Sequence, residues 1–322
     1  MENKVTHLYV AACAGDGGIY HYTLQDGQLT LRQQLCVDRP MYLELQGGTL
    51  RALLLSPFAD TAESGLITVP LDDDGALGTP SAPVSTHGLE ACHLCTRTGV
   101  TYVANYSSGS VFSTAGGFVT RTGHGPDTDR QEMSHPHCVL PTPDGRYLVG
   151  TDLGLDTVFV YDPQLHEVDH AKTPAGHGPR HLVFTADGRL LLCVNELAST
   201  VTVFRYRDGT LTALDTVSAL PTPDRNSYAA AIRLAGDRVL ISHRGQDCIT
   251  CQRLVGETLT PVYTVPCGGH WPRDFLVAGG LLFCANERSD TVSVLRPEGD
   301  GLTDTGLRLE LPHPLCIAAR SV

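Results

Sequence analysis

Residues 134–162, SHPHCVLPTPDGRYLVGTDLGLDTVFVYD, and residues 178–206, GPRHLVFTADGRLLLCVNELASTVTVFRY, repeat one pattern. Each segment has an apolar run, an Asp-Gly-Arg turn, a second apolar run, a polar loop and a third run of alternating apolar and polar residues. Short runs of this kind bounded by turn residues predict strands, and Asp-Gly between two of them predicts a hairpin. Each segment therefore predicts three antiparallel strands in succession.

The same pattern recurs along the whole chain with a period in the forties. The first strands of the repeats are predicted to begin at Pro40, Ala91, Pro136, Pro179, Tyr228, Pro272 and Pro314. A period of this length with about four short strands per repeat is typical of a β-propeller blade. We therefore predict an all-β, seven-bladed β-propeller that forms a single domain over residues 1–322.

The two ends of the chain each hold part of one repeat. The last repeat has only the strand PLCIAARSV, whereas the chain begins with two strands that lack a first strand. An unpaired strand edge is a liability that folded proteins avoid. We therefore expect the N- and C-terminal strands to share one blade and so to close the propeller.

Hairpin geometry predicts which polar residues meet at the open end of each hairpin. Facing residues of an antiparallel hairpin have a constant index sum, so the Asp-Gly turn of the second segment puts Arg180 across from Asn195, one step from Glu196. The turn of the first segment puts His137 across from Asp152 in the same way. Titratable residues thus gather away from the turns, and there we expect the chemistry.

In a propeller the first strand of each blade lines the central channel, so the starts of first strands and the ends of second strands converge. Guanidinium groups can bind an anion and stabilise an oxyanion, and a carboxylate or an imidazole can activate water. This combination suits acyl or lactone chemistry. The predicted catalytic residues are His137, Arg180, Glu196 and Arg244. The predicted substrate-binding residues are His135, Asp152, His181, Arg273, Glu287 and Tyr106.

Two alternatives apply to this polar group. The pairs of Arg180 with Glu196 and of Arg273 with Glu287 can instead be structural ion pairs that hold blades together. A metal ion held by Glu196, Asn195 and Asp152 is another possibility, but the nearby arginines would repel a cation. We therefore predict no metal and no other cofactor.

Composition restricts the partners and the compartment. The formal net charge of −12 disfavours nucleic acids and anionic membranes, and an anionic small substrate would need locally concentrated arginine and histidine. With the lactone chemistry above, the expected partner is a small anionic lactone. The start of the chain has no basic region followed by an apolar stretch, and its 11 cysteines are expected to be reduced thiols. We expect a cytoplasmic monomer or homodimer.

The segment 121–132, RTGHGPDTDRQE, is a long polar connection directly before the HPH stretch. A solvated loop is one interpretation of such a segment. The other is a flap over the mouth of the channel, because long connections often carry function.

The elements HPHCVLPTPDGRYLVGTDLG, GPRHLVFTADGRLLLCVNELASTV, VANYSSGSV and NERSDTVSV resemble the seven-bladed lactonase family. This family includes the bacterial propeller-type 6-phosphogluconolactonase and the fungal carboxymuconate-lactonising enzyme. The resemblance implies metal-independent hydrolysis of 6-phosphogluconolactone in the pentose phosphate pathway, or reversible cyclisation of a muconate. It also implies that a histidine of the HPH stretch, Arg180, Glu196 and Arg244 act in catalysis. A propeller that only binds a ligand through the same face is the alternative from another class.

Overall fold

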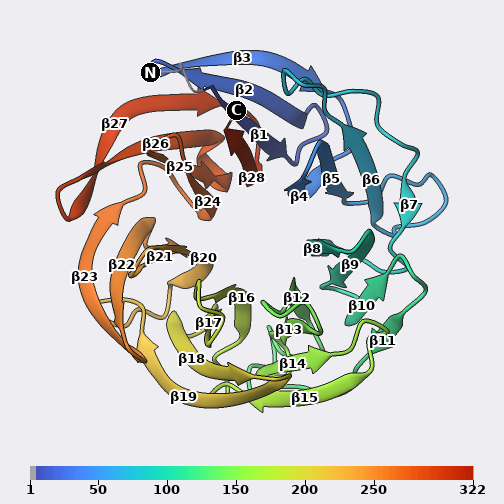
Figure 1. Cartoon of the computed structure of the whole chain (residues 1–322), viewed down its shortest axis with the longest axis vertical. Coiled ribbons are helices and arrows are strands. Elements are labelled where there is room, and N and C mark those ends of the chain that lie inside the picture. The colour runs from blue at the N-terminus through green and yellow to red at the C-terminus, as the bar shows by residue number, and fades with distance from the viewer. Residues whose placement is uncertain (1–4, 322) are drawn as a thin grey trace. The chain divides into compact units, whose positions relative to one another are not determined.

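The computed structural model describes residues 5–321, which form 28 strands and one short 3-10 helix, η1 (Glu287–Ser289). The strands make seven four-stranded sheets, and no α-helix occurs in this described part of the chain (Figure 1). The all-β fold class with seven blades is therefore confirmed. By its internal contacts the chain divides into two compact units, one up to Thr86 and from Val265 onward, the other His87–Thr264. The single domain stays a prediction.

The first unit holds three blades, and in each of them the strands pair in the following order. They are β28 (Pro314–Ser321), β1 (Thr6–Ala12), β2 (Gly18–Gln25) and β3 (Gln28–Leu35); β4 (Pro40–Gln46), β5 (Thr49–Leu54), β6 (Gly65–Pro70) and β7 (Val84–Ser85); and β24 (Pro272–Ala278), β25 (Leu281–Asn286), β26 (Thr291–Glu298) and β27 (Gly301–Glu310).

The second unit holds four blades, although the last strand ends just beyond it. They are β8 (Ala91–Arg97), β9 (Val100–Asn105), β10 (Ser110–Ser113) and β11 (Phe118–Thr120); β12 (Pro136–Pro141), β13 (Leu148–Asp152), β14 (Thr157–Tyr161) and β15 (Glu167–Lys172); β16 (Pro179–Phe184), β17 (Leu190–Asn195), β18 (Thr200–Arg207) and β19 (Thr210–Ser218); and β20 (Tyr228–Ala235), β21 (Arg238–Arg244), β22 (Cys248–Val255) and β23 (Thr258–Pro266).

All seven predicted starts of first strands are confirmed, because β4, β8, β12, β16, β20, β24 and β28 begin at those residues. The shared blade is confirmed too, since β28 pairs with β1 from Thr6 to Ala12. The N-terminal part supplies three strands of that blade rather than two. The third, β3, alternates between exposed and half-buried positions and carries little apolar signal.

The Asp-Gly turns differ from the expected two-residue type at one point. Gly188 has a φ of 69°, whereas Asp187 is not among the residues with positive φ. Instead the Gly188 N–H donates to the carbonyl of Thr185, and Asp187 Oδ1 accepts from the N–H of Arg189. This is a longer turn with a left-handed glycine, and it leaves the hairpin centred as predicted.

The hydrophobic cores of the second unit lie between neighbouring blades. Leu192 and Val203 of one blade pack in a cluster with Ile232 and Ile241 of the next, and all four are at most 1% exposed. Burying one such side chain contributes about 1.5 to 3 kcal/mol. This packing holds β16 and β20 beside each other. It therefore also fixes the distance between the residues at the starts of these two strands. All eleven cysteines lie in the described part as thiols without disulfides.

Candidate active site

A register break at the start of β16 determines where Arg180 lies. Pro179 pairs with Asn195 and His181 pairs with Val194, so Arg180 is the extra residue of a bulge. The predicted pairing of Arg180 with Asn195 is therefore wrong by one position. Regular alternation would assume one residue opposite each partner, whereas a bulge places two residues opposite one and re-aims a side chain.

The same break occurs at the start of β12. Pro136 rather than His137 pairs with Asp152, and regular pairing resumes at Cys138 with Thr151. The predicted pairing of His137 with Asp152 is wrong for the same reason. In each of the other blades the pairing also shifts within a few residues of the start of the first strand. The bulge is therefore a repeated feature of this chain.

Three arginines surround the carboxylate of Glu196, which directly follows β17. Oε2 lies 3.0 Å from Nε of Arg180 and 2.7 Å from Nη2 of Arg244, while Oε1 lies 2.5 Å from Nη2 of Arg130. Glu196 is only 2% exposed. Three of the four predicted catalytic residues, Arg180, Glu196 and Arg244, thus meet in one cluster together with Arg130.

The charges in this cluster keep Glu196 ionised. Burial alone would raise the pKa of Glu196, but the positive charges of Arg244, Arg180 and Arg130 outweigh it and hold the pKa well below its usual range. A carboxylate of this kind is a weak base. It is better suited to fixing the direction of the guanidinium groups, whose remaining N–H donors can then bind an anion or an oxyanion.

His137 is the better placed candidate for a general base. It is 9% exposed, its Nδ1 lies 3.7 Å from the Sγ of Cys92, and its ring packs edge-on against Tyr106 with 5.5 Å between centroids. It is also close enough to Glu196 for its protonated form to lower the pKa of that carboxyl further. The basic nitrogen and the arginine cluster thus share one neighbourhood.

Tyr106 and His135 form the next part of this neighbourhood. Their rings stack with 4.4 Å between centroids, and His135 Nδ1 lies 3.0 Å from the carbonyl oxygen of Tyr106. Burial raises the pKa of the Tyr106 phenol, so the hydroxyl stays protonated and can donate a hydrogen bond. Contact of either residue with substrate stays a prediction.

Both carboxylate oxygens of Asp152 accept hydrogen bonds from neighbouring residues. One oxygen accepts from the hydroxyl of Ser134 at 2.5 Å, and the other accepts from the N–H groups of His135 at 2.8 Å and Leu155 at 3.1 Å. The side chain thus holds together the two segments that flank β12 and β13. Its predicted role in substrate binding stays a prediction, which these bonds do not favour.

His181 lies in a buried group with His93 and Cys138, whose ligand atoms are within 4.8 Å of one another. These are metal-ligating types, but Nη1 of Arg233 lies 3.4 and 3.3 Å from the two ring nitrogens of His181. Burial and the charge of Arg233 hold the pKa of His181 well below its usual value. A cation there would face that guanidinium, so the geometry does not favour a metal.

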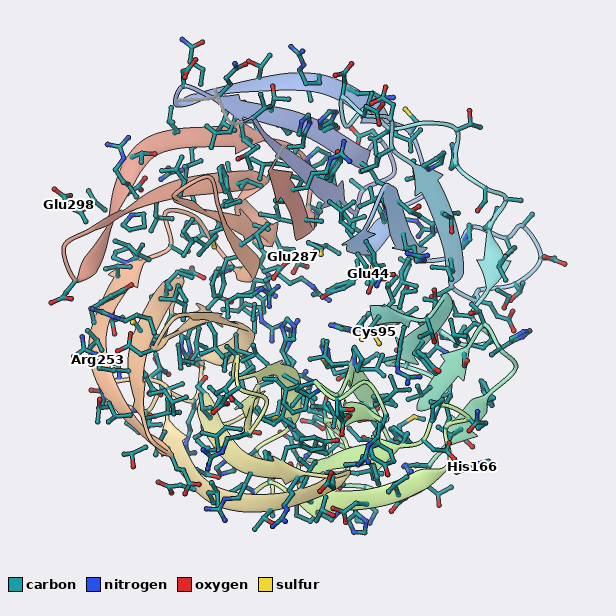
Figure 2. All side chains as sticks on the ribbon, in the orientation of Figure 1. Glu44, Cys95, His166, Arg253, Glu287 and Glu298 are labelled. Carbon is teal, nitrogen blue, oxygen red and sulfur yellow. The ribbon has the colours of Figure 1, made fainter. Side chains whose placement is uncertain are left out.

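Arg273 and Glu287 belong to the other unit. Their side chains form an ion pair with 3.2 Å between Nη1 and Oε2, and Glu287 follows β25 directly. Figure 2 shows another glutamate of this unit, Glu298, at the turn between β26 and β27. A part for this pair in substrate binding stays a prediction.

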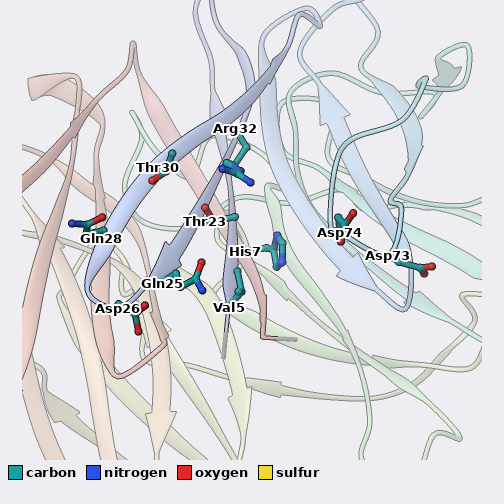
Figure 3. Close-up of a pocket in the computed structure, with 10 residues that line it drawn as sticks. All are labelled: Val5, His7, Thr23, Gln25, Asp26, Gln28, Thr30, Arg32, Asp73 and Asp74. Atoms are coloured by element: carbon teal, nitrogen blue, oxygen red, sulfur yellow. The ribbon is translucent and has the colours of Figure 1, made fainter. Parts of the chain in front are cut away.

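A cavity of about 650 Å³ in the first unit is lined by none of the predicted site residues. Figure 3 shows it between β2, β3 and the segment after β6. It is lined by Val5, His7, Thr23, Gln25, Asp26, Gln28, Thr30, Arg32, Asp73 and Asp74. Burial lowers the pKa of His7, whose ring stacks on that of His21. This cavity has no group arranged like the arginines around Glu196.

Arg130 is the member of the cluster that the sequence did not indicate. It lies in the long connection between β11 and β12, and its guanidinium is also 5.9 Å from the ring centre of Tyr228. The connection follows no repeat, so position within a blade could not single out this arginine. The length and polarity of the segment were the available signal.

The family model described as "Lactonase, 7-bladed beta-propeller" matches residues 7–319 of the chain. Uncharacterized protein SAS1845 of Staphylococcus aureus strain MSSA476 is 29% identical over 300 residues, with 85% of this chain and 87% of that protein covered. Uncharacterized protein SAUSA300_1902 of Staphylococcus aureus strain USA300 is 30% identical over the same shares of both proteins.

Two solved structures are similar over nearly the whole chain. A Bacteroides fragilis protein called a "putative 6-phosphogluconolactonase" has a TM-score of 0.89 and 26% identity, covering 99% of this chain and 98% of that one. The periplasmic gluconolactonase PpgL of Pseudomonas aeruginosa has a TM-score of 0.87 and 25% identity, covering 99% of each chain. Within the described residues, no helix has the length and apolar character needed to cross a membrane.

Proposed function

Because the chain belongs to the seven-bladed β-propeller lactonase family, we propose that it hydrolyses the ester bond of a sugar lactone. The substrate that fits best is 6-phospho-D-glucono-1,5-lactone, which would give 6-phosphogluconate as in the pentose phosphate pathway. The names of two similar structures, a "putative 6-phosphogluconolactonase" and a gluconolactonase, support this substrate class. We also propose the cytoplasm as the compartment, where eleven thiols would stay reduced.

The arginine cluster around Glu196 is the observation that carries the proposal. Three guanidinium groups share one carboxylate, so the cluster has a net positive charge although the whole chain has a net charge of −12. Lactone hydrolysis develops negative charge on the carbonyl oxygen and ends in a carboxylate. Within this cluster, the buried guanidinium groups of Arg180 and Arg244 are the fixed positive donors that stabilise both of these charges.

The proposed reaction assigns one role to each group. His137 removes a proton from water, and the resulting hydroxide attacks the lactone carbonyl carbon. Arg180 and Arg244 donate to the oxyanion of the tetrahedral intermediate, held in place by Glu196. The bond from that carbon to the ring oxygen then breaks, and the ring oxygen takes the proton from protonated His137 to become an alcohol. The new carboxylic acid releases its proton to solvent, so the hydroxy acid leaves as its carboxylate.

Acid release from a panel of lactones tests this proposal. The panel contains 6-phosphogluconolactone, the unphosphorylated glucono-1,5-lactone and a muconolactone, each compared in a pH-stat with its spontaneous hydrolysis. We expect acceleration of the sugar lactones. Absence of acceleration for both of them would overturn the proposal, and conversion of the muconolactone alone would assign the chain to the cyclase branch.

A further inference from the structure

The connection that carries Arg130, residues 121–135, is an ordered arm. Its anchor is Gln131, which has no exposed surface and donates from Nε2 to the carbonyl of Leu153 at 2.8 Å. Gln131 Oε1 accepts from the N–H of Asp127 at 3.2 Å, and the Gly125 N–H donates to the carbonyl of Gln131 at 2.9 Å. Arg130 is next to this anchor, so the arm holds its backbone in one place.

Arg130 differs from the other two arginines of the cluster in exposure. Its side chain is 37% exposed, whereas those of Arg180 and Arg244 are 7% and 8% exposed. The inner arginines also donate to backbone carbonyls, Arg180 Nη1 to Ala230 at 2.6 Å and Arg244 Nε to Tyr228 at 3.4 Å. A soluble anion can therefore reach the guanidinium of Arg130 with the least rearrangement.

An anion that binds to Arg130 also disturbs the ion pairs of Glu196 least. Arg130 is paired with Oε1 of Glu196, while Arg180 and Arg244 both pair with Oε2. If Arg130 turns to an incoming anion, Glu196 keeps two positive partners and stays ionised. A guanidinium offers five donors in a planar fork, which matches the oxygens of a phosphate group.

We propose that Arg130 is the specificity-determining residue that binds the phosphate group of the substrate, exchanging Glu196 Oε1 for a phosphate oxygen. This inference rests on the proposed lactone hydrolysis and names the part of the site that reads the phosphorylated substituent. Arg180 and Arg244 then remain with the carbonyl end of the substrate. Preference for a phosphorylated over an unphosphorylated lactone thereby depends on one residue of the arm.

Steady-state kinetics of Arg130→Ala and Arg130→Lys on the two sugar lactones form the first test. For Arg130→Ala we expect KM for 6-phosphogluconolactone to rise by about tenfold or more, and kcat/KM for gluconolactone to change by no more than about threefold. Arg130→Lys should recover part of the KM effect, since it keeps the charge but loses the fork. Arg146→Ala is the control, because Arg146 is an arginine with a 53% exposed side chain outside the cluster. Equal losses on both lactones would overturn the proposal.

A binding experiment separates this inference from the proposed reaction. Isothermal titration of the full chain with 6-phosphogluconate and with gluconate needs no turnover. We expect the wild type to bind the phosphorylated acid more tightly by about tenfold or more, and Arg130→Ala to lose that difference. This result would support the phosphate contact even if no lactone were hydrolysed. A wild type without preference, or an Arg130→Ala variant that keeps it, would overturn the contact even if hydrolysis were observed.

Discussion

Arg180 and Glu196 form a buried ion pair, with 3.0 Å between Nε and Oε2, because a bulge takes Arg180 out of the regular pairing of its hairpin. The bulge leaves Pro179 to pair with Asn195 and frees the arginine side chain to reach the carboxylate just beyond the partner strand. The bulge in β16 thus places the Arg180 guanidinium at the proposed oxyanion site.

Removal of the Arg180 guanidinium is expected to lower kcat more than it weakens substrate binding. Arg180→Ala should lower kcat for the sugar lactone roughly hundredfold, because one donor to the oxyanion is lost. The measurement is initial acid release at saturating substrate, with Arg146→Ala as the control. A kcat equal to that of the wild type would remove Arg180 from the transition state.

Loss of the Glu196 charge is expected to destabilise the fold. Glu196→Gln leaves buried Arg180 and Arg244 without their shared counter-charge, so the free energy of unfolding should fall by about 3 to 5 kcal/mol. Glu257→Gln is the matched control, because Glu257 pairs with Arg205 at 2.6 Å on the surface and should cost at most about 1 kcal/mol. Urea unfolding of both variants checks the prediction. Equal urea midpoints for Glu196→Gln and Glu257→Gln would show that the fold does not depend on the charge of Glu196.

Buried His243 should make the fold sensitive to acid. Burial lowers the pKa of His243 to about 3, whereas an unfolded histidine titrates near pH 6.5. The folded state excludes a proton that the unfolded state binds, so this stabilisation is complete above pH 6.5 and is lost as the pH falls toward 3. The loss is about 1.4 kcal/mol per pH unit at most.

His243→Gln tests this dependence by urea unfolding at pH 7 and pH 5. The variant should lose less free energy of unfolding between the two pH values than the wild type, by up to about 2 kcal/mol. His166→Gln is the control, because the side chain of His166 is 79% exposed. Figure 2 shows His166 at the turn between β14 and β15. Parallel loss in the wild type and in His243→Gln would contradict the prediction.

Turnover should survive removal of metal ions. A cation at Glu196 would have to displace three guanidinium groups from the carboxylate, and each of these would repel it. Lactone hydrolysis measured after exhaustive dialysis against EDTA is therefore expected to match the untreated protein. A loss that a divalent ion restores would point to a metal-dependent step.

The sequence was sufficient for the blades and for three of the four members of the cluster, Arg180, Glu196 and Arg244. Apolar runs, Asp-Gly turns and a period in the forties are local features, and they located the first residue of all seven first strands. The same periodicity placed Arg180 and Glu196 at the start and the end of neighbouring strands. Their positions near one end of the hairpin follow from the sequence, whereas their ion pair depends on the bulge at Arg180.

Tertiary structure alone decided which partner each polar side chain found. Arg130 reaches Glu196 from an arm outside the repeat, and the oxygens of Asp152 are taken by Ser134 and two backbone N–H groups. A bulge at Arg180 is equally invisible to residue counting, because regular alternation assigns every residue a partner. Sequence period determines where a residue lies along its strand, whereas the partner of a buried charge depends on every group that packing brings within a few ångströms.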